Sequence, residues 1–193
     1  LKMKQIRNQF LWGWWLIMNF CSRQFDEPPF SRGSMEVTIL MGSSSDMPVV
    51  KKCTVVLDRF EIDYQVRVAS AHRSPAFVES IVNDAIASGC KVFIACAGLA
   101  AALPGAVAAL TTKPVIGIPV GGKVPFDSLL SIVQLPPGVP AACVGVDRGD
   151  NAGLLAVQIL ALANDSLATA LAGEKQEQYD RVMAQDEQVQ GEL

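Results

Sequence analysis

The chain has 193 residues, of which 50% are hydrophobic and 18% are charged, which is typical of a domain with a buried core and excludes a disordered, coiled-coil or collagen-like chain. Its 16 basic and 19 acidic residues give a formal net charge of −3, which argues against nucleic acid as the main partner. Five irregularly spaced cysteines and a single histidine support neither a disulfide framework nor a Cys/His zinc site. We therefore expect a reducing, cytoplasmic compartment, with the thiols packed as small apolar groups.

Residues 1–34 differ in composition from the rest of the chain. They hold all three tryptophans, and three basic residues precede the apolar stretch 10–21, in partial resemblance to a signal peptide. That stretch is shorter than the roughly 20 apolar residues that cross a bilayer. We expect residues 1–34 to be an N-terminal extension outside the fold, with a peripheral anchor or a partner-binding tail as the alternatives. Residues 35–193 are expected to form one domain with a C-terminal helix and no membrane partner.

From residue 35 onward, apolar strands alternate with helical patterns. Strands are predicted over 36–41, 64–69, 91–96, 115–120 and 141–146. Helices are predicted after an N-cap at Asp46, after Ser74, beyond Pro104, over 153–163 and over 165–189. The apolar face of the second helix is expected to be Phe77, Val78, Ile81, Val82 and Ile86. This alternation predicts the α/β class, as a three-layer αβα sandwich with a central parallel sheet, doubly wound and flavodoxin-like.

The turns after the first three strands carry the polar side chains of interest. In doubly wound sheets ligands bind beyond the carboxyl ends of the strands, where this chain has turns at 42–46, 70–74 and 97–105. The serine-rich first turn leads into a helix and can hold a phosphate, and Asp46 can accept hydrogen bonds from sugar hydroxyls. An ordinary capped turn is the alternative. Arg73 in the second turn favours the phosphate reading, because a guanidinium matches phosphate oxygens.

His72 is the only histidine in the chain, so any imidazole chemistry must use it. It directly follows a predicted strand and lies between Ala71 and Arg73, in a turn and not on the apolar face of a helix. Imidazole side chains titrate near neutral pH and can both give and take a proton. A structural histidine is the alternative, but the position favours an acid/base role.

These turns, together with the strings KPVIGIPV at 113–120 and DSLLSIVQ at 127–134, resemble the class I 5-(carboxyamino)imidazole ribonucleotide mutases, the bacterial-type phosphoribosylaminoimidazole carboxylase catalytic subunits. The resemblance runs from residue 35 to about residue 185. It implies a catalytic domain that moves a carboxylate from the exocyclic nitrogen to the ring carbon of 5-(carboxyamino)imidazole ribonucleotide in de novo purine biosynthesis. It also implies a small-molecule substrate, a homo-octamer, and no metal or other cofactor.

The resemblance assigns roles residue by residue. His72 would be the proton shuttle. The 5′-phosphate would be held by Ser43, Ser45 and Arg73, the ribose hydroxyls by Asp46, and the imidazole by Ser70 and the backbone around Ala71 and Gly98. The apolar turn 97–103 would close over the pocket and restrict water, which would otherwise let carbon dioxide escape.

Two departures from the family pattern leave alternatives open. The family usually has the string AAHLPG in its third turn, and this chain has Ala102 in place of that histidine. The loop 121–126 is also shorter than usual, which would alter closure of the pocket. Two alternatives to the mutase function therefore remain: a related nucleotide carboxylase or decarboxylase, and a non-catalytic nucleotide-phosphate-binding module.

Overall fold

One five-stranded parallel sheet organises the domain, in a computed structural model that describes residues 35–100 and 102–192. The expectation for residues 1–34 lies outside these described residues. The strands are β1 (Val37–Met41), β2 (Tyr64–Val68), β3 (Val92–Gly98), β4 (Val115–Val120) and β5 (Ala142–Cys143), in the order β2-β1-β3-β4-β5. Every neighbouring pair is parallel. This strand order is that of flavodoxin-like sheets, so the predicted fold class is confirmed.

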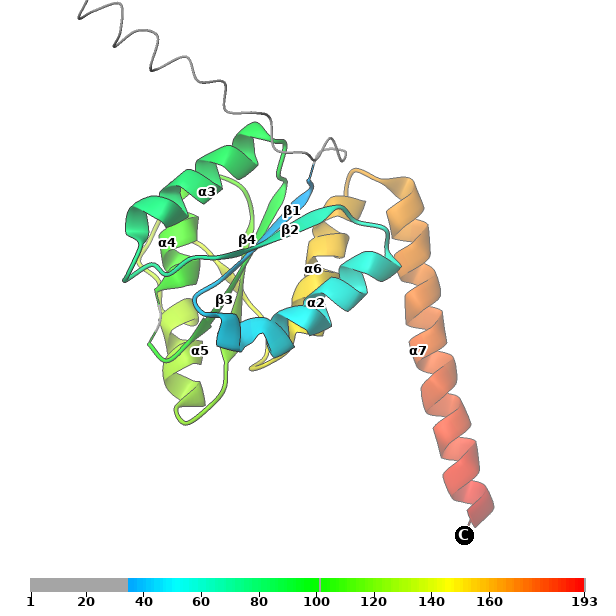
Figure 1. Cartoon of the computed structure of the whole chain (residues 1–193). Coiled ribbons are helices and arrows are strands. Elements are labelled where there is room, and N and C mark those ends of the chain that lie inside the picture. Colours follow the sequence, from blue (N-terminus) through cyan, green and yellow to red (C-terminus); the bar gives the residue numbers. More distant parts are fainter. Residues whose placement is uncertain (1–34, 101, 193) are drawn as a thin grey trace, which may run out of the picture. The chain divides into compact units, whose positions relative to one another are not determined.

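Helices cover both faces of the sheet and complete the three layers (Figure 1). The helices are the short 3-10 turn η1 (Ser44–Asp46), α2 (Met47–Arg59), α3 (Pro75–Ala87), α4 (Leu103–Leu110), α5 (Pro125–Val133), α6 (Gly149–Ala161) and α7 (Asp165–Glu192). Helices α2 and α6 lie on one face, and α3, α4 and α5 lie on the other. The predicted alternation of strands and helices is thus present along the described chain.

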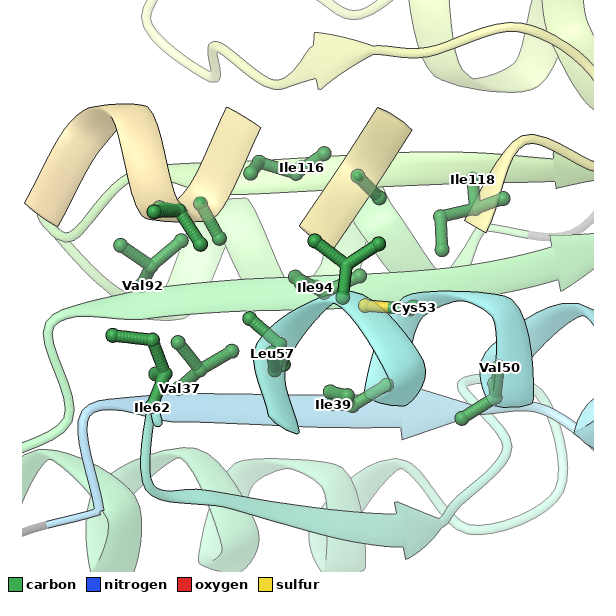
Figure 2. Close-up of a cluster of buried hydrophobic side chains, with 14 of the residues drawn as sticks. Val37, Ile39, Val50, Cys53, Leu57, Ile62, Val92, Ile94, Ile116 and Ile118 are labelled. Carbon is green, nitrogen blue, oxygen red and sulfur yellow. The ribbon is translucent and has the colours of Figure 1, made fainter. Parts of the chain in front are cut away.

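The larger core lies between the sheet and the α2/α6 layer. Alternate strand residues point into it, and Figure 2 shows six of them, Val37, Ile39, Val92, Ile94, Ile116 and Ile118, in one cluster with Val50, Cys53 and Leu57 of α2. The intervening residues Leu40, Phe93 and Ala95 face α3 and α4 in a second core. Because both faces are covered at the centre of the sheet, the strands β1, β3 and β4 are nearly continuous apolar runs, which is why they could be located from the sequence.

Helices α2 and α6 approach each other closely at two glycines of α6. A Cβ atom on Gly149 would lie 2.1 Å from the carbonyl oxygen of Val49, and one on Gly153 would lie 2.9 Å from the carbonyl oxygen of Cys53. Only residues without a side chain permit this approach. The contact fixes the position of α2, whose first turn follows the polar loop after β1.

The structure differs from the predicted elements at three places. Helix α5 was not predicted, although a parallel β4–β5 pair needs a crossover of this kind. Helix α6 begins at Gly149, four residues before the predicted start, because Asp150 stabilises the first turn by accepting a hydrogen bond from the Asn151 amide at 2.9 Å. The predicted strand 141–146 is reduced to Ala142–Cys143 at the sheet edge, after which the chain turns toward α6.

The predicted apolar face of α3 was wrong at two positions. Phe77 and Ile86 are exposed, whereas the buried face consists of Val78, Ile81, Val82 and Ala85. The Phe77 ring instead lies 5.6 Å from the Arg67 guanidinium of β2, a cation–π contact at the surface.

The C-terminal helix is present as predicted, from Asp165 to Glu192, and none of its described residues is buried. Leu167 and Leu171 at its start pack against the core of the α2/α6 layer. Glu174 forms an ion pair with Arg59 of α2 at 3.0 Å. The first turns of α7 therefore lie on the surface of their own domain.

The thiols of the described residues fit the expectation drawn from composition. Cys53, Cys90 and Cys96 are buried, Cys143 is half-buried, and none of these four is in a disulfide. Burial, with a smaller contribution from the charge of Asp150, raises the pKa of the Cys53 thiol to about 12. Within residues 35–100 and 102–192, no helix combines the length and hydropathy needed to cross a membrane.

Candidate active site

A cavity of about 450 Å³ opens at the carboxyl ends of β1, β2 and β3. It lies where the strand order reverses between β1 and β3, the position at which flavodoxin-like sheets bind ligands. Its lining residues are Gly42, Ser43, Ser45, Asp46, Ser70, His72, Arg73, Ala97, Gly98 and Leu99. The structure therefore brings together every predicted site residue except Ala71.

The turn after β1 is organised by Ser43. Its Oγ accepts hydrogen bonds from the Ser45 amide at 3.3 Å and from the Ser45 hydroxyl at 2.9 Å, and so caps η1. Asp46 stands at the predicted N-cap position of α2, but its side chain makes no capping hydrogen bond. The reason is that Asp46 already has helical dihedral angles, φ −85° and ψ −4°, at the end of η1. Its carboxylate is left to line the cavity.

Asp46 as a whole residue is only 8% exposed. Burial raises the pKa of Asp46, and hydrogen bonds from the Ser45 hydroxyl at 3.3 Å and from the Ser43 backbone lower it by less. A buried carboxylate with few donors around it gains from accepting further hydrogen bonds. Asp46 is therefore suited to a ligand that brings hydroxyl groups, such as a ribose.

We expect Asp46→Asn to weaken ligand binding and to stabilise the folded protein relative to the wild type. The folded state binds the Asp46 proton more tightly than the unfolded chain does, so ionisation destabilises the fold as the pH rises from the ordinary carboxyl pKa through the raised folded value. The free energy of unfolding of Asp46→Asn, relative to that of the wild type, should therefore increase as the pH rises from about 4 to neutrality. The affinity for the ribonucleotide should fall about tenfold. Urea unfolding at both pH values, with the exposed Asp63→Asn as the control for losing one carboxyl, checks this; a pH-independent difference contradicts it.

The turn after β2 is closed by reciprocal serine hydrogen bonds. The Ser70 amide donates to Ser74 Oγ at 3.1 Å, and Ser74 Oγ donates to the Ser70 carbonyl oxygen at 3.1 Å. This arrangement ends β2 and starts α3 at Pro75, which suits the first helical position because proline lacks an amide proton. The residues between the two serines, including His72 and Arg73, are held at the edge of the sheet.

Arg73 bridges the first two turns. Its Nη2 donates to the Gly42 carbonyl oxygen at 2.9 Å, and its Nε donates to Ser70 Oγ at 3.3 Å. The guanidinium is thus oriented at the cavity wall by two contacts, and it has further N–H donors for an anion. Gly42, which the sequence analysis did not single out, supports the site through its backbone oxygen; its place directly after β1 was the available signal.

His72 is exposed and contributes to the cavity wall. Among the residues that the structure describes, none hydrogen-bonds to its ring, so both ring nitrogens are accessible to a ligand. Ala71 is not part of the cavity wall, and its side chain packs against the core formed with α3 and α4.

The turn after β3 supplies the remaining wall. Gly98 is paired with Val120 of β4, and Leu99 follows it with a positive φ of +56°. Ala102, which replaces the histidine usual in the resembling family, is exposed at the N-terminus of α4 and does not line the cavity.

The chemistry of the wall suits a sugar phosphate. Hydroxyl groups and a guanidinium can bind phosphate oxygens, a carboxylate can bind a diol, and an imidazole can transfer a proton. Over the described part of the chain, no three His, Cys, Asp or Glu side chains converge as a metal-binding group.

Comparison with known proteins identifies the family. A model of the AIR carboxylase family matches residues 36–181. The chain belongs to the AIR carboxylase family. It is 51% identical over 154 residues to the N5-carboxyaminoimidazole ribonucleotide mutase of Methanocaldococcus jannaschii, covering 79% of this chain and 96% of that protein. The protein of the same name from Mycobacterium tuberculosis is 47% identical over 156 residues, covering 80% of this chain and 90% of that protein.

The fold of this AIR carboxylase family member also matches solved structures. The crystal structure of Treponema denticola PurE superposes with a TM-score of 0.72 at 30% sequence identity, covering 79% of this chain and 96% of that chain. The match supports the five-stranded parallel sheet and its flanking helices.

Proposed function

We propose that this protein is an N5-carboxyaminoimidazole ribonucleotide mutase, an isomerase of purine biosynthesis that acts through residues 35–193. One observation supports this most strongly: the single imidazole of the chain, His72, shares a cavity with the Arg73 guanidinium and the buried Asp46 carboxylate. Sequence identity of 51% to a relative of that name, over nearly the whole of that relative, points to the same reaction.

In this proposal the substrate lies across the three turns. Ser43, Ser45 and Arg73 bind the 5′-phosphate, because their hydroxyl and guanidinium donors stand together at the β1 and β2 edge. Asp46 accepts hydrogen bonds from the ribose hydroxyls. The imidazole ring is placed against Ser70 and the backbone around Ala71 and Gly98.

His72 then transfers one proton in each direction. Protonation of the carbamate nitrogen by His72 breaks the nitrogen–carboxylate bond and gives carbon dioxide and the neutral aminoimidazole ribonucleotide. The electron-rich ring carbon attacks the carbon dioxide, and the now neutral His72 removes the proton from that carbon. The proton given in the first half is recovered in the second, so the net reaction is an isomerisation.

The direct test is to incubate the purified chain with 5-(carboxyamino)imidazole ribonucleotide and follow formation of the C-carboxylated product. We expect a large acceleration over buffer, and a rate equal to that in buffer would contradict the proposal.

A carboxylase that takes carbon dioxide from solution is the second candidate, because Ala102 leaves the α4 N-terminus without an imidazole. ¹³C-bicarbonate in the buffer separates the two, since only that carboxylase introduces the label in every turnover.

The variant Arg73→Lys tests the phosphate assignment. Lysine cannot keep both the Gly42 contact and a bidentate contact to phosphate, so we expect the KM for the ribonucleotide to rise about tenfold. Binding of the corresponding nucleoside, which lacks the phosphate, should be unchanged in calorimetric titrations. Arg67→Lys, whose guanidinium lies over the Phe77 ring outside the cavity, is the matched control. Equal weakening of nucleoside and nucleotide binding would contradict the assignment.

We also propose that the chain assembles as a homo-octamer in the cytoplasm. Support for assembly comes from α5, which exposes Phe126, Leu130 and Val133 along one side, Phe126 being 74% exposed. Exposed apolar faces of this kind mark protein interfaces. The four free thiols among the described residues fit a reducing compartment. Light scattering checks the assembly, and a monomer at micromolar concentration would overturn it; cell fractionation checks the location.

A further inference from the structure

Three residues other than glycine have a positive φ: Glu61 (+55°), Leu99 (+56°) and Asp147 (+58°), among those that the structure describes. Two of them have a local explanation. Glu61 follows the end of α2, where left-handed residues are common. Asp147 belongs to a residue type that tolerates this conformation, and its Oδ1 accepts a hydrogen bond from the Gly121 amide at 2.9 Å. Leu99 has neither explanation.

The left-handed turn at Leu99 places a large apolar side chain outside the core. Ala97 and Leu103, on either side of it in the chain, are 1% and 2% exposed, whereas Leu99 is 68% exposed. A leucine here gains little from burial and has an unfavourable backbone conformation. Strained residues of this kind concentrate at functional sites, and Leu99 lines the cavity that contains His72.

Among the described residues, Leu99 is also the only large apolar side chain in that cavity wall. The other described lining residues are glycine, alanine, serine, aspartate, arginine and histidine. The polar groups among these suit a phosphate, a ribose and a proton, and the one apolar side chain besides Leu99 is the methyl group of Ala97, so Leu99 is the large apolar group that an uncharged, apolar intermediate would meet. The proposed reaction forms such an intermediate, carbon dioxide.

We propose that Leu99 is the apolar wall that retains carbon dioxide between the two halves of the reaction, an inference that rests on the proposed mutase function. When the carbamate is protonated, the nitrogen–carboxylate bond breaks and carbon dioxide lies beside the aminoimidazole ring. If it is retained, the ring carbon forms the new carbon–carbon bond and gives up its proton. If it escapes, the products are aminoimidazole ribonucleotide and free carbon dioxide, with one proton consumed.

The test uses Leu99→Gly and Leu99→Asn on the full chain. Glycine and asparagine both tolerate the left-handed conformation, so each variant removes the apolar surface without opposing the turn. The substrate carries ¹³C in its carboxylate, and the buffer contains unlabelled bicarbonate. The measured quantities are the ¹³C fraction of the product and the aminoimidazole ribonucleotide released per product formed.

We expect the wild type to retain nearly all of the label and both variants to release about tenfold more aminoimidazole ribonucleotide per product, with a smaller change in KM. Leu99→Met, which keeps an apolar side chain, should restore retention. Glu61→Gly, which relieves a positive φ outside the cavity, should retain label as the wild type does.

The outcomes separate this inference from the function on which it rests. A wild type that forms no C-carboxylated product would overturn the mutase function itself. A working wild type together with variants that retain label equally well would overturn the role of Leu99 and leave the mutase function standing. Loss of label in Glu61→Gly as well would also overturn it, because the effect would then not belong to the cavity. Thermal unfolding confirms that each variant is folded, and Leu99→Asn alone suffices if Leu99→Gly does not fold.

Discussion

The variant His72→Asn should bind the ribonucleotide with nearly wild-type affinity and lose about 10²–10⁴-fold in kcat, the range typical of a lost general acid/base. Asparagine keeps a polar side chain at the cavity wall but cannot carry a proton between two atoms of the substrate. No described residue hydrogen-bonds to the His72 ring, so its removal should leave the turn between Ser70 and Ser74 intact. Steady-state kinetics and calorimetric titration with the ribonucleotide measure the two effects.

The matched control for His72→Asn is Glu79→Gln, which removes another exposed titratable side chain, from α3 and outside the cavity. It should leave both kcat and affinity unchanged. Loss of binding and turnover together in His72→Asn would make the imidazole a structural or binding group. An unchanged kcat would show that His72 carries no step of the reaction, and absence of turnover in the wild type would favour the binding-module alternative.

The convergence of the site could be predicted because it follows from the strands. His72 and Asp46 are 26 positions apart in the sequence, yet each follows a strand of one parallel sheet. Parallel strands bring their carboxyl ends to one edge, so locating β1, β2 and β3 was enough to bring the three turns together. Apolar runs buried on both faces gave β1 and β3 a clear pattern, whereas β2 is a half-buried strand.

The details of the site depended on features that local patterns do not encode. The contact between Arg73 and the Gly42 carbonyl oxygen joins two turns and depends on how the chain folds back. Asp46 makes no capping hydrogen bond because a 3-10 turn precedes α2, and a serine-rich sequence does not distinguish that turn from a simple cap. The left-handed backbone at Leu99 is opposed by the preference of leucine itself, so no sequence rule predicts it.

The second large effect is expected from Gly149→Ala in the contact between α6 and α2. An alanine Cβ would lie 2.1 Å from the carbonyl oxygen of Val49, and a backbone atom cannot move aside as the end of a flexible side chain can. We expect the free energy of unfolding to fall by about 3 kcal/mol and Tm by roughly 6–12 °C. Differential scanning calorimetry and urea unfolding measure both quantities.

The control for Gly149→Ala is Gly173→Ala in α7, where an added Cβ would meet no atom within 4 Å. Alanine is the better helix former by about 1 kcal/mol, so Gly173→Ala should be as stable as the wild type or more stable. Because α2 begins directly after Asp46, the separation of α2 from α6 in Gly149→Ala should also move that carboxylate, and the KM for the ribonucleotide should rise in the fraction that stays folded. Wild-type stability of Gly149→Ala would contradict this expectation, because it would show that the contact between α2 and α6 does not require glycine at this position.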